Sequence, residues 1–220
     1  QKKYPLFCCD RAYAKIAGLG VVPQFLMVAD MSDDVGAFLE GLETRRVVLV
    51  APTYVSPRVL EYQWKAKFFY NVSDVDKGYT SAAVNLTGGR ITSIPGGVIV
   101  GNMAFVVAKI AGCNPITFIG SDLSMPEPSS RPGEISYEGK DPDGKTVYSL
   151  PGFLSGFEWL LKFLEVDIDT KSNILKVFNS TEGGIMYSER LPALSLKDFM
   201  QRYPGVEKSL NTIIDRKIGR

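Results

Sequence analysis

Short apolar runs alternate with amphipathic segments along most of this 220-residue chain, and this alternation limits the fold more than any other feature. Continuous apolar runs of about four to eight residues between helical segments are typical of buried parallel strands joined by crossover helices. The pattern predicts an α/β fold with a doubly wound, mostly parallel sheet and helices on both faces. We expect one sheet to contain strands at 5–9, 25–29, 46–51, 115–120 and 174–178, and 66–72 is a further strand candidate.

The segments between these runs have the composition and spacing of helices. They lie at 10–18, 33–43, 56–64, 96–113 and 151–167. The C-terminal tail at 195–220 is predicted to form two more helices, with Ser195 as the N-cap of the first. A long loop at 121–150, rich in Pro, Gly and Ser, is typical of a functional lid or a disordered excursion. Because the length suits one substantial core, we expect a single domain over 1–220.

Charge and hydropathy exclude several classes of partner. The chain has 25 Lys and Arg against 24 Asp and Glu, and no basic run, so the electrostatic footprint of a nucleic-acid-binding protein is missing. No apolar run reaches the about 20 residues that a membrane span needs, and no signal peptide opens the sequence. Three cysteines at spacings that match no zinc pattern indicate reduced thiols. We therefore expect a cytoplasmic protein without a metal centre built on cysteine.

The complete absence of histidine restricts the chemistry. Ser-His-Asp and Cys-His nucleophile systems, histidine metal clusters and an imidazole general base are all excluded. Any catalytic acid or base must be Asp, Glu, Tyr, Lys or a group of the substrate.

Three predicted strands end on a carboxylate: Asp10 after "FCC", Asp30 after "MVA" and Asp122 after "TFIGS". In open parallel sheets the ligand crevice lies beyond the carboxyl ends of the strands. The sequence therefore predicts that the three side chains gather on one rim of the sheet. The alternative interpretation is that each Asp caps the helix that follows it, which fits Asp122 least because no helix follows promptly.

The segment "NSTEGG" at 179–184 is a second candidate for ligand binding. Small hydroxyl and amide donors followed by two glycines let the backbone come close to a phosphate or a sugar. A simple turn after a strand would use the same residue types. Other glycine-rich stretches, at 86–91 and 94–102, do not match the G-x-x-x-x-G-K-[ST] pattern, so an ordinary phosphate-loop kinase is excluded.

Three stretches of the sequence resemble one known family. They are "CCDRAYAKIAGLGVVPQFLMVADMS", "GNMAFVVAKIAGCNPITFIGSDLSM" and "FNSTEGGIM". Together, over roughly residues 5 to 200, they resemble the motility accessory factor (Maf) family, whose core is related to archaeal 6-hydroxymethylpterin diphosphokinases and resembles bacterial sialyltransferases. The resemblance implies a Rossmann-like sheet. Relatives usually begin with a Gly-Pro-Ser-Leu type loop and carry a His after the "DL" pair, and this sequence shows neither.

The resemblance also implies a set of site residues. Asp122 and Glu182 fall within the matched motifs, and we expect these two carboxylates to be the catalytic residues. The residues implied to bind the nucleotide are Asp10, Arg11, Asp30, Gly120, Ser121, Asn179, Thr181 and Gly183, and Ser180 is added because its hydroxyl is a suitable donor. We expect the amide of Asn179 to be exposed at its strand end and to donate to the nucleotide.

The implied activity is transfer of a nonulosonic acid from a CMP-sugar to a protein hydroxyl, such as Ser or Thr of flagellin. Departure of CMP requires stabilisation of a leaving phosphate, and the acceptor hydroxyl must lose its proton to a base such as Asp122 or Glu182. One alternative is an ATP-dependent diphosphokinase, in which the carboxylates would hold Mg²⁺. Another is a non-catalytic remnant that binds a nucleotide-sugar or a protein partner.

Overall fold

The computed structural model describes residues 4–72, 77–170 and 175–205. The chain divides into two compact units, one formed by residues 1–96 with 205–220 and the other by residues 97–204. We call them unit 1 and unit 2, and the described residues of each are treated separately. The single domain over 1–220 stays a prediction.

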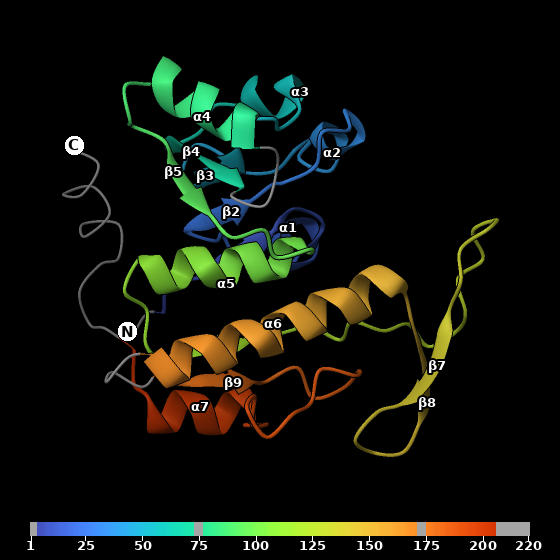
Figure 1. Ribbon diagram of the computed structural model, residues 1–220. Coiled ribbons are helices and arrows are strands. Elements are labelled where there is room, and N and C mark those ends of the chain that lie inside the picture. The colour runs from blue at the N-terminus through green and yellow to red at the C-terminus, as the bar shows by residue number, and fades with distance from the viewer. Residues whose placement is uncertain (1–3, 73–76, 171–174, 206–220) are drawn as a thin grey trace. The chain divides into compact units, whose positions relative to one another are not determined.

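Unit 1 is built on a five-stranded sheet in which every neighbouring pair of strands is parallel. The strand order is sequential (Figure 1). The strands are β1 (Phe7–Cys9), β2 (Phe25–Met27), β3 (Val48–Pro52), β4 (Ala66–Val72) and β5 (Thr92–Ile94). The helices between them are α1 (Asp10–Ala17), α2 (Asp34–Ala37), α3 (Pro57–Leu60) and α4 (Lys77–Leu86).

The core of unit 1 lies against this sheet because its central strands are apolar on both faces. Every residue of β3 is buried. Cys8, Leu26 and Leu49 are partners in register on three adjacent strands, and all three are buried. Tyr13 of α1 and Val59 of α3 belong to the same cluster and are fully buried. The two helices therefore cover the face of the sheet that carries Cys8, Leu26 and Leu49.

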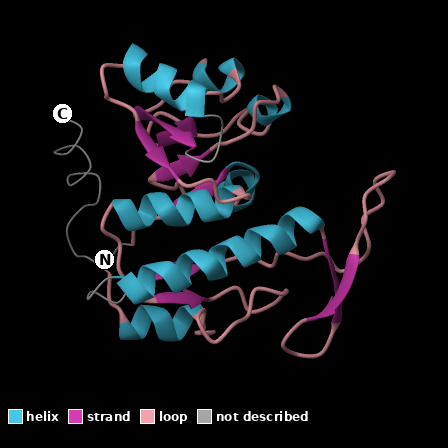
Figure 2. Cartoon of the chain, in the orientation of Figure 1, coloured by secondary structure: helices cyan, strands magenta, loops and turns pink. Residues whose placement is uncertain are grey.

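The described residues of unit 2, 97–170 and 175–204, form two smaller sheets and three helices, which are drawn in Figure 2. Strand β6 (Ile116–Phe118) pairs in parallel with β9 (Val177–Asn179), and β7 (Tyr137–Lys140) forms an antiparallel hairpin with β8 (Thr146–Ser149). The helices are α5 (Val100–Ile110), α6 (Pro151–Thr170) and α7 (Leu196–Arg202). Phe105 of α5 packs against both β6 and α6. Its ring centre lies 5.6 Å from that of Phe118 on β6 and 5.8 Å from that of Phe163 on α6.

Buried Asn102 fixes the start of α5 in unit 2. Its Nδ2 donates to the carbonyl oxygens of Gly97 at 2.6 Å and of Gly156 at 2.7 Å. A Cβ on Gly97 would lie 2.5 Å from the Cβ of Asn102, so only glycine allows this approach. The amide thus holds α5 against α6.

The structure confirms the α/β class and the mostly parallel sheet. The prediction of one sheet for all strands is wrong, because β6 and β9 pair with each other and not with the strands of unit 1. An apolar run shows that a strand is buried but not which strand lies beside it. The five strands of unit 1 run in sequential order, so the reversal that defines a doubly wound sheet does not occur among them.

Several element boundaries differ from the sequence-based expectations. The helix expected at 33–43 is limited to Asp34–Ala37, and β5 and α4 were not predicted at all. The long loop at 121–150 contains the β7–β8 hairpin, which extends away from α6 in Figure 2. Ser195 is confirmed as the N-cap of α7, since its Oγ accepts from the Asp198 amide at 3.1 Å. The second tail helix falls outside the described residues.

Within the part of the chain that the structure describes, none of the helices combines the length and the apolar character required to cross a membrane. The three cysteines are free thiols. Burial raises the pKa values of Cys8 and Cys9 to about 12, with the charge of Asp10 acting in the same direction. Both thiols therefore stay protonated at neutral pH and are poor nucleophiles.

Candidate functional site

In unit 2, two turns lie side by side at the carboxyl ends of β6 and β9. The strands are parallel, with Phe118 opposite Asn179, so both chains leave the sheet at the same edge. We call residues 119–123 and 180–185 the turn pair. Two hydrogen bonds join its halves: Ser121 N donates to Thr181 Oγ1 at 3.1 Å, and Ile185 N donates to Asp122 O at 2.9 Å. A third, from Ser180 N to Phe118 O at 2.8 Å, joins the second half to the end of β6.

Left-handed backbone conformations shape the turn pair. Gly120 and Gly184 have φ values of 64° and 77°, and Leu123 and Glu182 have 48° and 62° although they carry side chains. Non-glycine residues in this region cost about 1 kcal/mol or more each and persist only where the surroundings hold them. Such conformations concentrate at ligand sites, because they aim backbone amides in directions that regular strands do not allow.

Asn179 is a structural residue, and the expectation of an exposed amide is wrong. Its side chain is 2% exposed. The Nδ2 donates to Met186 O at 2.6 Å, and the Oδ1 accepts from Thr181 N at 2.9 Å. Buried Ser180 is similarly engaged, because its hydroxyl donates to Leu194 O at 2.7 Å and lies 2.7 Å from the hydroxyl of Thr117. Both side chains stabilise the conformation of the turn pair. Their polar atoms are already hydrogen-bonded within the protein, so few of them are available to a ligand.

The groups that remain for a ligand are backbone amides and carboxylates. Among the described residues, no partner accepts a hydrogen bond from the amide N–H of Asp122, Glu182 or Gly184. The side chains of Asp122 and Glu182 are exposed. The turn pair thus combines unpaired donors, which suit an anionic oxygen, with carboxylates that can accept a proton.

Tyr187 is a residue near the turn pair that the sequence interpretation did not include. Burial raises the pKa of its phenol, and the charges of Asp143, Asp141 and Asp122 raise it further, while a hydrogen bond with the Gly183 backbone opposes them. The phenol therefore keeps its proton at neutral pH. Its position after "NSTEGGIM" carries no signal in the sequence, because Asp141 and Asp143 come from a distant hairpin turn.

In unit 1, Asp10 and Asp30 lie at the ends of the adjacent parallel strands β1 and β2. Burial raises the pKa of Asp10; Arg11, through its amide and its charge, opposes the rise, and the negative charge of Asp30 adds to it. The capping interpretation does not hold for Asp10, because Cys9 is the N-cap of α1. Asp30 forms a local turn, in which its Oδ1 accepts from Ser32 N at 2.8 Å. The two carboxylates are thus neighbours on one rim.

The predicted site residues fall into two groups. Asp10, Arg11 and Asp30 belong to unit 1, and the guanidinium of Arg11 lies 4.8 Å from the ring centre of Phe38. The residues in and beside the turn pair of unit 2 are Gly120, Ser121, Asp122, Asn179, Ser180, Thr181, Glu182 and Gly183. The placement of Asp122 on one rim with Asp10 and Asp30 stays a prediction.

Asn71, near the end of β4, was also missed as a polar residue at the same edge of the unit 1 sheet. It is 1% exposed, and its Oδ1 accepts from the Thr53 hydroxyl at 2.9 Å. Among the residues that the structure describes, its Nδ2 has no hydrogen-bond partner. The signal was present in "FFYNV", where a polar residue follows a run of aromatic ones, as Asp10 and Asp30 follow apolar runs.

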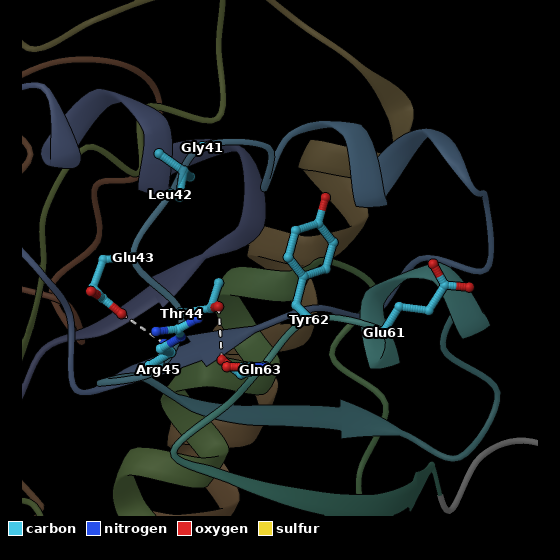
Figure 3. Close-up of a pocket in the computed structure, with 8 residues that line it drawn as sticks. All are labelled: Gly41, Leu42, Glu43, Thr44, Arg45, Glu61, Tyr62 and Gln63. Carbon is cyan, nitrogen blue, oxygen red and sulfur yellow. Dashed lines mark hydrogen bonds between the residues drawn. The ribbon is translucent and has the colours of Figure 1, made fainter.

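An open cavity of about 510 Å³ lies elsewhere in unit 1 (Figure 3). Its lining residues are Gly41, Leu42, Glu43, Thr44, Arg45, Glu61, Tyr62 and Gln63. They precede β3 and β4, so the cavity lies at the amino ends of these strands, opposite the edge that carries Asp10 and Asp30. The Thr44 hydroxyl donates to Gln63 O at 2.8 Å and closes one side. The cavity contains none of the predicted site residues.

Comparison with known proteins supports the resemblance seen in the sequence. A family model described as 6-hydroxymethylpterin diphosphokinase MptE-like matches residues 1–128. Among solved structures, a Maf glycosyltransferase from Magnetospirillum magneticum AMB-1 matches with a TM-score of 0.68 at 17% identity, over 97% of this chain and 32% of that one. At this identity the likeness shows the fold alone. A search of curated proteins found no match.

The family match covers more than half of the chain, and the structural match extends the same fold over nearly all of it. Both agree with the sequence motifs around Asp10, Asp30 and Asp122. The chain belongs to the 6-hydroxymethylpterin diphosphokinase MptE-like family.

Proposed function

We propose that this chain is the core of a Maf-like glycosyltransferase, which moves a nonulosonic acid from a CMP-sugar to a protein hydroxyl, such as Ser or Thr of flagellin, in the cytoplasm. The observation that carries the proposal is the turn pair, where the amides of Asp122, Glu182 and Gly184, which have no acceptor within the described part of the chain, lie beside two exposed carboxylates. The likeness to a Maf glycosyltransferase supports this choice of reaction.

The proposed reaction separates the roles of backbone and side chains. When the bond between the sugar carbon and the phosphate oxygen breaks, its electron pair stays on the phosphate, and the amides of the turn pair stabilise that charge. The acceptor hydroxyl bonds to the sugar carbon and gives its proton to Asp122 or Glu182. Tyr187, which keeps its proton, donates a hydrogen bond to the leaving phosphate. The products are CMP and the glycosylated protein.

The second candidate is an ATP-dependent diphosphokinase, which the description of the matching family favours. This reaction needs Mg²⁺, which usually takes one or two carboxylates together with phosphate oxygens. Asp10 and Asp30 fit that requirement, because they are neighbours and the negative charge of Asp30 raises the cost of ionising Asp10. The cation would supply charge neutralisation at the phosphates. A remnant that binds nucleotide without catalysis is the third candidate.

Thermal unfolding with CMP, cytidine, ATP with Mg²⁺, and pterin separates these candidates. CMP at about 100 times its dissociation constant is expected to raise the melting temperature by about 5–10 °C, because a ligand that binds only the folded state stabilises it by about 2.7 kcal/mol. Cytidine, which has no phosphate, should give a clearly smaller shift. A shift with ATP and Mg²⁺ but not with CMP would favour the diphosphokinase, and no shift with any nucleotide would favour the remnant.

Glu182→Gln tests the catalytic role without disturbing the backbone donors. The variant is expected to bind CMP at least as well as the wild type, because it loses a negative charge near the phosphate, but to release CMP from a CMP-sugar at least about 100-fold more slowly. Glu189→Gln is the control, since Glu189 is also exposed but lies outside the turn pair. Equal rates in the wild type and both variants would exclude Glu182 as the base.

A further inference from the structure

Strand β7 of unit 2 leaves one edge of its hairpin unpaired. At the turn of the hairpin, Asp141 N donates to Lys145 O at 3.0 Å, so these two residues form a hydrogen-bonded pair of the ladder. Such pairs alternate with non-hydrogen-bonded pairs along antiparallel strands, and the backbone groups of Glu138 and Lys140 therefore point away from β8. Within the described ranges these outward groups have no backbone partner.

The opposite edge of the hairpin supports this register. Tyr148 of β8 lies opposite Glu138, and its N–H donates to Met125 O at 2.9 Å while its carbonyl accepts from Met125 N at 2.7 Å. The backbone groups of Tyr148 thus point away from β7, as the alternation requires. Met125 occupies the β8 edge, whereas Glu138 and Lys140 at the β7 edge are exposed.

One face of the hairpin lies on the turn pair. Gly139 and Ser149 share this face, because Ser149 is opposite Tyr137, two residues before Gly139. A Cβ on Gly139 would lie 3.8 Å from Cγ2 of Ile185, and the Ser149 hydroxyl donates to Leu123 O at 2.7 Å. Ile185 and Leu123 come from the two halves of the turn pair. We call this side of the hairpin the inner face.

An extended chain added to β7 would present alternate side chains to the turn pair. The added strand would lie about 4.8 Å from β7 and follow the same pleat. Its residue opposite Gly139 directs its side chain to the inner face, and the two flanking residues pair their backbones with Glu138 and Lys140. A Ser or Thr opposite Gly139 therefore brings its hydroxyl to the side of the hairpin on which the turn pair lies.

The charges around this edge favour a basic segment. Residues 137–149 and the turn pair contain the carboxylates of Asp122, Glu138, Asp141, Asp143 and Glu182 and the amines of Lys140 and Lys145. Burial raises the pKa of the Tyr187 phenol, and the charges of Asp143, Asp141 and Asp122 raise it further, so the negative potential extends from the hairpin turn to the turn pair. A peptide with Lys or Arg beside its hydroxyl residue is attracted to such a surface.

We propose that the free edge of β7 binds the acceptor polypeptide as an added strand, with a Ser or Thr opposite Gly139 and basic residues beside it. The inference rests on the proposed function for the identity of the acceptor, and it adds the surface that selects it. Main-chain hydrogen bonds to Glu138 and Lys140 recognise an extended segment of almost any sequence. The acceptor hydroxyl must therefore lie in an exposed loop or terminus and not in a helix.

The first test uses a heptapeptide with a central Thr between two Lys residues, acetylated at its N-terminus and amidated at its C-terminus. Its binding to the CMP-saturated protein is measured by fluorescence anisotropy of the labelled peptide. N-methylation of the two Lys residues removes the N–H groups that face β7 and is expected to weaken binding at least about tenfold. N-methylation of the Thr, whose N–H faces away from β7, is the control and should change the affinity less than about twofold.

The second test changes the protein. Glu138→Pro removes one outward N–H, and edge strands tolerate Pro where the N–H faces solvent. Peptide affinity should fall at least about tenfold, with the CMP affinity and the melting temperature unchanged. Thr146→Pro is the matched control, because Thr146 lies opposite Lys140 and its N–H points to the other edge of the hairpin. Glu138→Gln keeps the N–H but not the charge, and should lose less than about threefold.

Equal affinity for the two methylated peptides, or equal peptide binding by Glu138→Pro and Thr146→Pro, would overturn the inference. A dimer in analytical ultracentrifugation that only Glu138→Pro dissociates would also overturn it, because a second copy would then occupy the edge. If CMP shifts the turn-pair amides but no peptide binds, the proposed function stands without this acceptor site. Peptide binding at β7 without CMP binding would support the edge and contradict the proposed function.

Discussion

Replacing Gly184 by alanine is expected to destabilise the protein by at least about 3 kcal/mol, which lowers the melting temperature by about 6–12 °C. Gly184 has a φ of 77°, and an added Cβ would lie 2.0 Å from Asp122 O and 2.5 Å from Asp122 Cα. These are backbone atoms, so no side chain can rotate away to relieve the contact. The two halves of the turn pair would have to separate, and the hydrogen bond from Ile185 N to Asp122 O would break.

The neighbouring glycine provides the matched control. A Cβ on Gly183 would meet only Asp122 Oδ1, at 3.9 Å, which is an ordinary contact. Gly183→Ala should therefore change the melting temperature by no more than about 2 °C. Circular dichroism of both variants against temperature measures the difference. Equal melting temperatures for the two variants would mean that the backbones of Asp122 and Gly184 are not in contact.

Asn179→Ala is expected to lower the free energy of unfolding by about 2–4 kcal/mol. The side chain is buried and makes two hydrogen bonds, so alanine leaves the carbonyl of Met186 and the amide of Thr181 without partners. Urea unfolding measures the change. Asn85→Ala is the control, because Asn85 is exposed on α4 and its loss should cost less than about 0.5 kcal/mol.

An Asn179→Ala protein as stable as the wild type would contradict the structural role of this amide. If the large loss is found, reduced nucleotide binding by this variant reflects a disturbed turn and gives no information on direct contacts. Binding is better tested with Glu182→Gln, whose side chain is exposed and whose loss leaves the hydrogen bonds between the halves of the turn pair intact.

The strands with continuous apolar runs could be predicted from the sequence. Strand β4 occupies 66–72, as expected, because its aromatic run is bounded by polar residues. Strand β5 was missed since only Ile94 of its three residues is buried, and two glycines precede it closely. The pairing of β6 with β9 could not be predicted, because a run of apolar residues contains no information on the neighbouring strand.

The candidate site was predictable in position but not in detail. Strand-end residues such as Asp30 and Asp122 are visible because carboxylates are rare at the ends of apolar runs. The burial of Asn179 was not visible, since it depends on contacts with Met186 and Pro192, which fold back over the strand. The position of Asn71 after an aromatic run was visible in the sequence, but its burial and the lack of a partner for its Nδ2 among the described residues were not, because both depend on its neighbours in space.

The central claim is that the amides of the turn pair hold the phosphate of a cytidine nucleotide. A titration of ¹⁵N-labelled protein with CMP, followed by amide chemical shifts, tests it most directly, because the proposed donors are themselves the observed groups. The backbone signals of Asp122, Glu182 and Gly184 are expected to shift together, with one dissociation constant, and cytidine should leave them unchanged. CMP binding that moves other signals while these three stay in place would contradict the claim.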